Sequence, residues 1–201
     1  MIPPVSPSFS GVLVGFHGYA EDAELQMERL RATAGNSGWL CVSIQALHRF
    51  YRGRTERVGA SWMTGQDRLL AIADNIAYVK SCLDAVRTEW PECADLPGIF
   101  AGFSQGVAMA FRAAVHAASQ GSGVIAVGGD IPPEINTQEL TRVSKVLLIR
   151  GTTDDWYTQE KFATDQHRLR ESGVPFRAQE LTGGHEWSAD VTAVAAEFLG
   201  S

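Results

Sequence analysis

The pentapeptide Gly102-Phe103-Ser104-Gln105-Gly106 constrains this chain more than any other stretch. An apolar run, 98–101, precedes it, and a run rich in helix formers, 107–115, follows it. A strand, G-x-S-x-G and a helix in that order are typical of a nucleophile elbow, in which the serine sits on a sharp, strained turn. The alternative is an ordinary tight turn with a serine of no chemical role. The catalytic interpretation therefore requires a base, an acid and oxyanion donors elsewhere in the chain.

The bulk properties narrow the class of protein. The 201 residues fit one domain, 1–201, that is long enough to bury a core without a disulfide or metal staple. No apolar run approaches the length of a membrane span, and the start lacks the basic and apolar regions of a signal peptide. We therefore expect no stable membrane insertion and a cytoplasmic location. The net charge of −6 argues against a nucleic-acid partner.

The cysteines carry no metal or disulfide pattern. The chain has an odd number of cysteines at wide spacing, which matches neither a zinc site nor a disulfide framework. They are Cys41, Cys82 and Cys93. Cys41 and Cys82 fall within apolar periodic segments and are predicted core thiols. We expect neither a metal nor a cofactor.

Apolar runs alternate with amphipathic segments along the chain. The alternation predicts an α/β fold of three layers, with a mainly parallel sheet of about six strands flanked by helices. The expected strands are 12–16, 39–44, 98–103, 124–127, 145–149 and 175–181. Five helices are expected: one after Asp22, one over 69–90, one over 104–119, one that contains Phe162 and Leu169, and one that closes the chain after Trp187.

Residues 46–65 differ from the rest because they combine four arginines with aromatic side chains and show no clean period. They predict a long excursion over one edge of the sheet, as a lid or as part of the substrate site. The arginines can bind a carboxylate or phosphate of the substrate, or belong to a solvated loop with Glu56 among their partners; we favour the second. They are Arg49, Arg52, Arg54 and Arg57.

Polar residues follow four of the predicted strands, and the carboxyl ends of parallel strands form the edge where ligands bind. Of the five histidines, only His185 lies both near this edge and in a glycine-rich turn, so it is the predicted base for Ser104. His17 follows the first strand and is predicted to be structural. Asp154 and Asp155 both suit the acid, and their spacing alone does not choose between them.

Backbone donors and a pocket are also predicted near the serine. An oxyanion needs two donors, and the N–H groups of Gln105 and Tyr19 follow strand ends. Large side chains beside these motifs are expected to line an apolar acyl or alcohol pocket, although each can equally belong to the core. They are Tyr19, Trp62, Met63, Trp156 and Trp187.

Four motifs together resemble the phospholipase/carboxylesterase branch of the α/β-hydrolase superfamily, which includes acyl-protein thioesterases and small bacterial esterases. They are 16–18, 102–106, 151–154 and 184–187, and they span the chain from about residue 11 to its end. The family pattern G-x-x-D falls on Asp154. The resemblance therefore implies a triad of Ser104, Asp154 and His185, with the oxyanion hole formed by the N–H groups of Tyr19 and Gln105. Residues 60–63 resemble the segment that lines the acyl site of this branch.

Two features depart from the pattern of the branch. Gly129-Asp130 stands where Ser-Gly is usual, and the arginine-rich stretch is not general. Both bear on the substrate rather than on the reaction.

The resemblance implies a serine hydrolase that cleaves small carboxylic esters of short to medium acyl chains through an acyl-enzyme on Ser104. Acyl thioester hydrolysis, lysophospholipid hydrolysis and peptide hydrolysis are alternatives that share this machinery. An alternative of another class is a non-catalytic binding protein on the same fold, which would normally lack a nucleophile, base or oxyanion donor. The sequence does not determine whether the chain forms a homo-oligomer.

Overall fold

A six-stranded parallel sheet forms the centre of the computed structural model, which describes residues 9–118 and 121–200. The strand order β2-β1-β5-β6-β7-β8 and the parallel pairing of all neighbours confirm the predicted α/β fold. The strands are β1 (Gly11–Phe16), β2 (Trp39–Ile44), β5 (Gly98–Phe103), β6 (Ser122–Val127), β7 (Val143–Gly151) and β8 (Phe176–Leu181).

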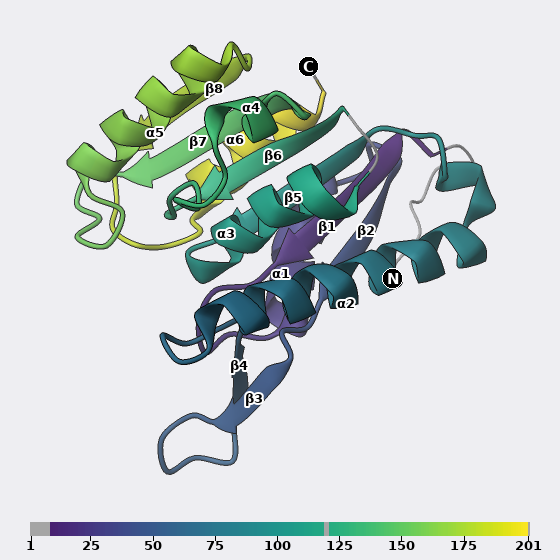
Figure 1. Ribbon diagram of the computed structural model, residues 1–201, viewed down its shortest axis with the longest axis horizontal. Coiled ribbons are helices and arrows are strands. Elements are labelled where there is room, and N and C mark those ends of the chain that lie inside the picture. Colours follow the sequence, from purple (N-terminus) through teal and green to yellow (C-terminus); the bar gives the residue numbers. More distant parts are fainter. Residues whose placement is uncertain (1–8, 119–120, 201) are drawn as a thin grey trace.

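Helices cover both faces of this sheet (Figure 1). Strand residues alternate between the faces, so Leu13 packs in the cluster with α1 and α6 whereas Val14 packs in the cluster with the other helices. Burial on both faces explains why β1, β2, β5, β6 and β7 contain continuous apolar runs, whereas the edge strand β8 is only partly buried. One layer holds α1 (Ala23–Ala34) and α6 (Ala189–Leu199), and the other holds α2 (Arg68–Glu89), α3 (Gln105–Arg112), α4 (Thr137–Leu140) and α5 (Gln159–Ser172).

The helix ends follow local signals with two differences. Asp22 caps α1, since its carboxylate accepts the Leu25 N–H at 2.9 Å, and α2 ends before Pro91. The helix that follows Ser104 changes at Ala113 into a π-helical turn, Ala113–Ala117, and Ser119, its predicted end, lies outside the described residues. The short helix α4 was not predicted.

The apolar stripe of α2 is buried only in part. Val79, Leu83 and Val86 reach the core, but Leu69 is 79% exposed and Leu70 is 67% exposed. The apolar periodicity that predicted a helix over 69–90 therefore does not mark core-facing residues at the amino-terminal end. None of the helices in the described part of the chain is long and apolar enough to cross a membrane.

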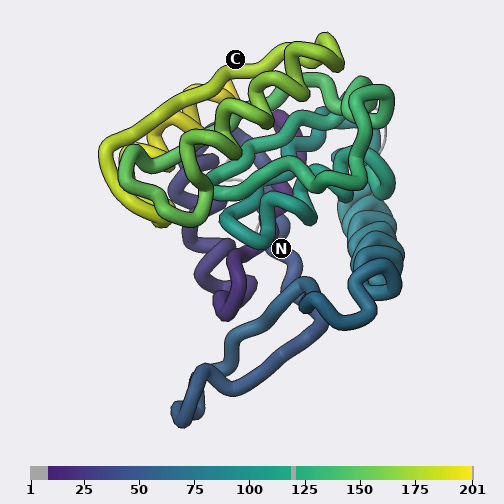
Figure 2. The backbone as a smooth tube through the Cα atoms, turned by 60° about the vertical axis from the view of Figure 1, so that its left-hand side comes forward, coloured from purple at the N-terminus to yellow at the C-terminus, as the bar shows by residue number. Residues whose placement is uncertain are grey.

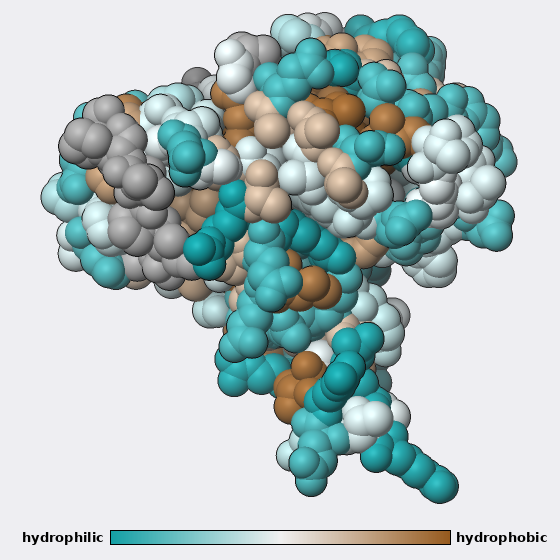
Figure 3. Space-filling view, turned by 180° about the vertical axis from the view of Figure 1, so that it is seen from behind, coloured by the Kyte–Doolittle hydropathy of each residue, from teal (hydrophilic) through white to brown (hydrophobic). Residues whose placement is uncertain are grey.

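The arginine-rich stretch forms an antiparallel hairpin outside the central sheet, of β3 (His48–Tyr51) and β4 (Val58–Ser61). It projects from the body of the molecule, and its surface is mostly hydrophilic with isolated apolar patches (Figures 2 and 3). No strand was predicted here, because the strands depend on pairing with each other and on the bonds that join Ala20 and Glu21 to Ala60. Its arginines are exposed and form no ion pair with Glu56 or any other described carboxylate.

Candidate active site

Ser104 stands between β5 and α3 in a conformation that serine rarely adopts. Its φ of 52° and ψ of −118° lie outside the regions allowed to most residues. The turn is tight as well: a Cβ on Gly106 would lie 2.1 Å from the Phe16 carbonyl oxygen, and one on Gly102 would lie 2.4 Å from the Gly106 oxygen. The two motif glycines are therefore required because β5, α3 and the end of β1 meet here.

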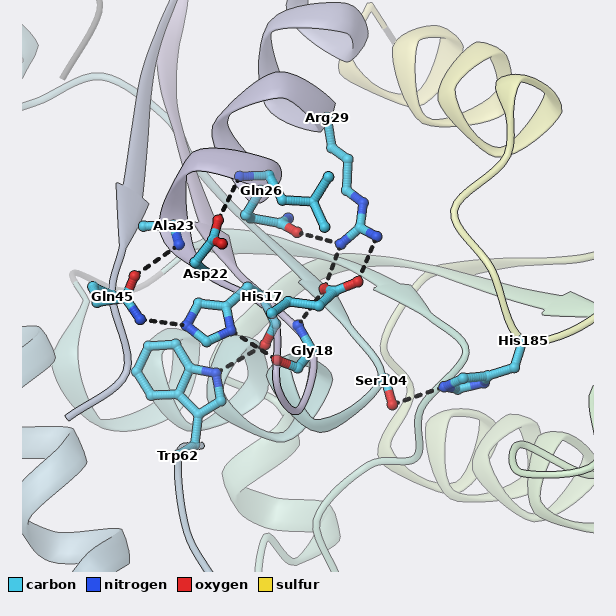
Figure 4. Close-up of polar contacts among 12 residues, drawn as sticks. His17, Gly18, Asp22, Ala23, Gln26, Arg29, Gln45, Trp62, Ser104 and His185 are labelled. Carbon is cyan, nitrogen blue, oxygen red and sulfur yellow. Dashed lines mark hydrogen bonds and ion pairs between the residues drawn. The ribbon is translucent and has the colours of Figure 1, made fainter. Parts of the chain in front are cut away.

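The structure brings Ser104, His185 and Asp154 together. His185 Nε2 lies 2.8 Å from Ser104 Oγ (Figure 4), and its Nδ1 lies 2.8 Å from Asp154 Oδ2. Asp154 is 2% exposed, and its other oxygen accepts the N–H groups of Trp156 and Tyr157 at 2.8 and 2.9 Å. In this arrangement the imidazole can accept the serine proton while the carboxylate holds the ring.

Asp155 lies apart from this chain of hydrogen bonds. Its side chain is exposed and lines the adjacent cavity, whereas that of Asp154 turns inward to His185. The structure therefore separates two neighbouring carboxylates that spacing alone left equivalent.

The loop after β1 is held by a buried histidine. His17 Nε2 accepts the Ala46 N–H at 3.1 Å, so Nδ1 carries the proton and donates to the Gly18 carbonyl at 2.7 Å. Burial lowers the pKa of His17, which favours this neutral ring. The Gly18 carbonyl also accepts the Glu21 N–H, at 3.2 Å. His17 is thus structural in its contacts, as predicted.

Two backbone donors are left free beside Ser104. The peptide between Gly18 and Tyr19 is planar and trans, so its N–H points opposite to its carbonyl. Because His17 and the Glu21 N–H bind the Gly18 carbonyl, the Tyr19 N–H points away from both of them. Among the described residues, neither this N–H nor that of Gln105 has an acceptor. Tyr19 and Gln105 line the same cavity as Ser104, where an oxyanion can use both donors.

A cavity of about 970 Å³ opens beside the serine. Met63 and Trp156 line it, as the sequence predicted, together with Tyr19. Trp62 does not line it: the side chain is fully buried, and its indole N–H donates to the His17 carbonyl at 2.9 Å. Trp187 also lies outside the lining. An aromatic residue beside a motif can face either the cavity or the core, and these two face the core.

Sequence reasoning assigned no role to two of the side chains at this cavity. The Gln105 side chain accepts the Trp62 N–H and donates to the Met63 carbonyl, both at 2.9 Å, so it holds the cavity wall against the elbow. Arg68 lines the cavity from the start of α2 and contacts the Met63 sulfur at 3.4 Å. No sequence signal distinguished either side chain. No group of three or more His, Cys, Asp or Glu residues in the described part of the chain could hold a metal ion.

Comparisons with known proteins identify the family and the fold. The model of the phospholipase/carboxylesterase family matches residues 10–200. The crystal structure of esterase PE8 is 25% identical, with a TM-score of 0.73 over 99% of this chain and 95% of that one. No curated protein matches the chain.

Two further solved structures share the fold. A carboxylesterase from Mesorhizobium loti is 15% identical, with a TM-score of 0.76 over 99% of both chains. The Bacillus cereus carboxylesterase is 15% identical, with a TM-score of 0.68 over 95% of this chain and 88% of that one.

Proposed function

Because the chain belongs to the phospholipase/carboxylesterase family of hydrolases, we propose that it cleaves carboxylic esters of short to medium acyl chains through an acyl-enzyme on Ser104. One observation carries the proposal. The Ser104 hydroxyl, the His185 ring and the Asp154 carboxylate form an unbroken chain of 2.8 Å contacts at a cavity with two free N–H donors.

Each residue has one role in the proposed reaction. His185 takes the hydroxyl proton as Ser104 attacks the ester carbonyl, and Asp154 stabilises the resulting imidazolium. The oxyanion of the tetrahedral intermediate accepts the N–H groups of Tyr19 and Gln105. His185 then returns the proton to the departing alcohol. A water molecule, deprotonated by His185, attacks the acyl-enzyme; the bond to Ser104 breaks, His185 returns the proton to the Ser104 oxygen, and the acid is released.

The cavity supports a small-molecule ester as the substrate. About 970 Å³ is at the upper end of the range of small-molecule sites. Met63, Ala108 and Trp156 offer apolar contacts to an acyl chain, and Arg68, Asp130 and Asp155 keep part of the lining polar. Thioesters and lysophospholipids remain alternative substrates, since the same residues would act on them. The three cysteines are free thiols, which supports a reducing, cytoplasmic setting.

A series of p-nitrophenyl esters from acetate to palmitate tests the proposal, with an acyl thioester and a lysophospholipid as parallel substrates. We expect turnover that is highest for short and medium chains and absent in Ser104→Ala. A fluorophosphonate probe should label the wild type and not the variant. If no substrate is turned over and the probe does not label, the chain is a non-catalytic protein and the proposal fails.

A further inference from the structure

Arg29 joins two parts of the active site that are far apart in the sequence. Its guanidinium donates to both oxygens of Glu21, at 2.6 and 2.7 Å, and Glu21 in turn accepts the Gly18 N–H at 2.8 Å. The side chains of Arg29 and Glu21 are only 13% and 16% exposed. Figure 4 shows Arg29 reaching from α1 to the Gly18 turn. A two-pronged pair of this kind holds its carboxylate in one orientation.

The guanidinium also donates to Gln26 Oε1 at 3.2 Å, and it lies close to two aromatic rings. It lies 4.5 Å from the centre of the Phe103 ring and 5.7 Å from that of Trp187. The Phe103 ring packs against the His185 imidazole with a centroid distance of 5.1 Å. Phe103 also meets the Gly18 backbone, because a Cβ on Gly18 would lie 3.0 Å from its ring. Phe103 therefore contacts both His185 and the turn after β1, residues 17–21, which we call the oxyanion loop.

We propose that Arg29 is a positioning residue, which holds the Gly18 N–H, one peptide before the Tyr19 donor, through the Glu21 carboxylate and holds the His185 ring through Phe103, against which Trp187 also packs. The proposal rests on the proposed function, because it assigns Arg29 to the oxyanion hole and the base of that reaction. Arg29 touches none of the reacting groups itself.

The physical reason is that guanidinium is planar, donates in a fork and stacks on rings, so one residue can serve a carboxylate and an aromatic pair together. Glu21 immediately precedes the capped start of α1, and Arg29 lies on that helix, so the pair ties the oxyanion loop to a rigid element. The Trp187 side chain is likewise attached to a helix, because its indole N–H donates to the Thr192 hydroxyl of α6 at 3.1 Å.

The test compares Arg29→Met, Arg29→Lys and Glu21→Gln with the wild type. We expect Arg29→Met to lower kcat by about 10- to 30-fold, part of the 10²–10³ that follows complete loss of an oxyanion donor. KM should stay within about twofold of the wild-type value, because Arg29 does not line the cavity. Arg29→Lys keeps the charge and should recover kcat to within about fivefold of wild type. Arg31→Met, an exposed position on the same helix, is the matched control and should change neither constant.

Two further measurements separate positioning from simple stabilisation. An alkyl trifluoromethyl ketone forms a hemiketal oxyanion on the serine, so its Ki should rise by the factor by which kcat/KM falls. The double variant Arg29→Met/Glu21→Gln should lose no more kcat than Arg29→Met alone, because the two residues act as a unit.

The proposal is overturned if Arg29→Met lowers the thermal midpoint but leaves kcat and Ki unchanged, if the loss lies in KM, or if the two losses multiply. Should Arg29→Met not fold, Glu21→Gln must by itself lower kcat at least fivefold and raise Ki equally; an unchanged kcat overturns the proposal. A wild-type protein that neither hydrolyses esters nor binds the ketone refutes the proposed function instead.

Discussion

The strained backbone of Ser104 predicts an inverted order of stability between two inactive variants. Ser104→Ala and Ser104→Gly both remove the hydroxyl and its contact with His185. They differ in the backbone, because alanine must keep the φ of 52° and ψ of −118° that only glycine adopts readily. We therefore expect Ser104→Gly to be more stable than Ser104→Ala.

The magnitude follows from two opposing terms. Backbone strain at such a site costs about 1–3 kcal/mol, and glycine relieves it. Glycine also loses about 0.5–1 kcal/mol relative to alanine, because its unfolded chain is more flexible. The net difference in the free energy of unfolding is about 1 kcal/mol in favour of Ser104→Gly, or about 2–4 °C in the thermal midpoint of a chain of this length.

Urea unfolding and thermal unfolding of the pair provide the assay, with a second pair at Ser43 as the control. Ser43 is the penultimate residue of β2, is not among the residues with positive φ and has a buried hydroxyl with no partner among the described residues. There the usual order should hold, with Ser43→Gly less stable than Ser43→Ala by about 0.5–1 kcal/mol. If Ser104→Ala equals or exceeds Ser104→Gly while the Ser43 pair behaves as stated, the elbow is not strained and the reasoning is refuted.

Three other predictions follow from particular side chains. Asp154→Asn should lower kcat by about 10⁴, and Asp155→Asn by less than about fivefold; ester kinetics that show the reverse would transfer the role of the acid. Burial raises the pKa of Asp165 to about 6, although Tyr157, the Ile131 N–H and Arg168 oppose the shift. The protonated carboxyl is therefore favoured in the folded protein. The stability that it contributes is present below about pH 4 and is lost as the pH rises through 6. Asp165→Asn should therefore gain stability relative to wild type between pH 4 and 7, by up to about 3 kcal/mol in urea unfolding, and a difference that does not vary with pH would contradict this. Arg52→Gln/Arg54→Gln should leave kcat/KM for neutral and anionic esters within about twofold, because both side chains are exposed on the hairpin; a loss confined to anionic esters would show that they bind substrate.

Most of the sheet could be predicted from the sequence because its strands other than β8 are largely buried on both faces. All six residues of β6 are buried, and such runs stand out without any knowledge of their neighbours. The hairpin β3–β4 could not be predicted in the same way, since its residues are mostly exposed and its strands depend on each other. The periodicity of α2 identified the helix but not which of its apolar residues are buried, so the exposure of Leu69 was missed.

In the candidate site, too, some residues could be predicted from the sequence and others could not. Ser104 could be singled out because the motif encodes its own turn, and His185 because it alone follows a strand end within a glycine-rich turn. The inward rotation of Asp154 and the core position of Trp62 could not be read from their spacing. Adjacent side chains leave a loop in different directions, and only the packed surroundings decide which one is buried.

The sequence by itself determined the order of the six central strands and the five longer helices along the chain, and the backbone of the elbow, because both depend on residues that are neighbours in the chain. The tertiary structure alone decided which carboxylate meets His185, which aromatic residues line the cavity, and that Arg29 meets Phe103 and Trp187. Those contacts join segments separated by tens of residues. Their geometry exists only once the sheet has placed its carboxyl ends side by side.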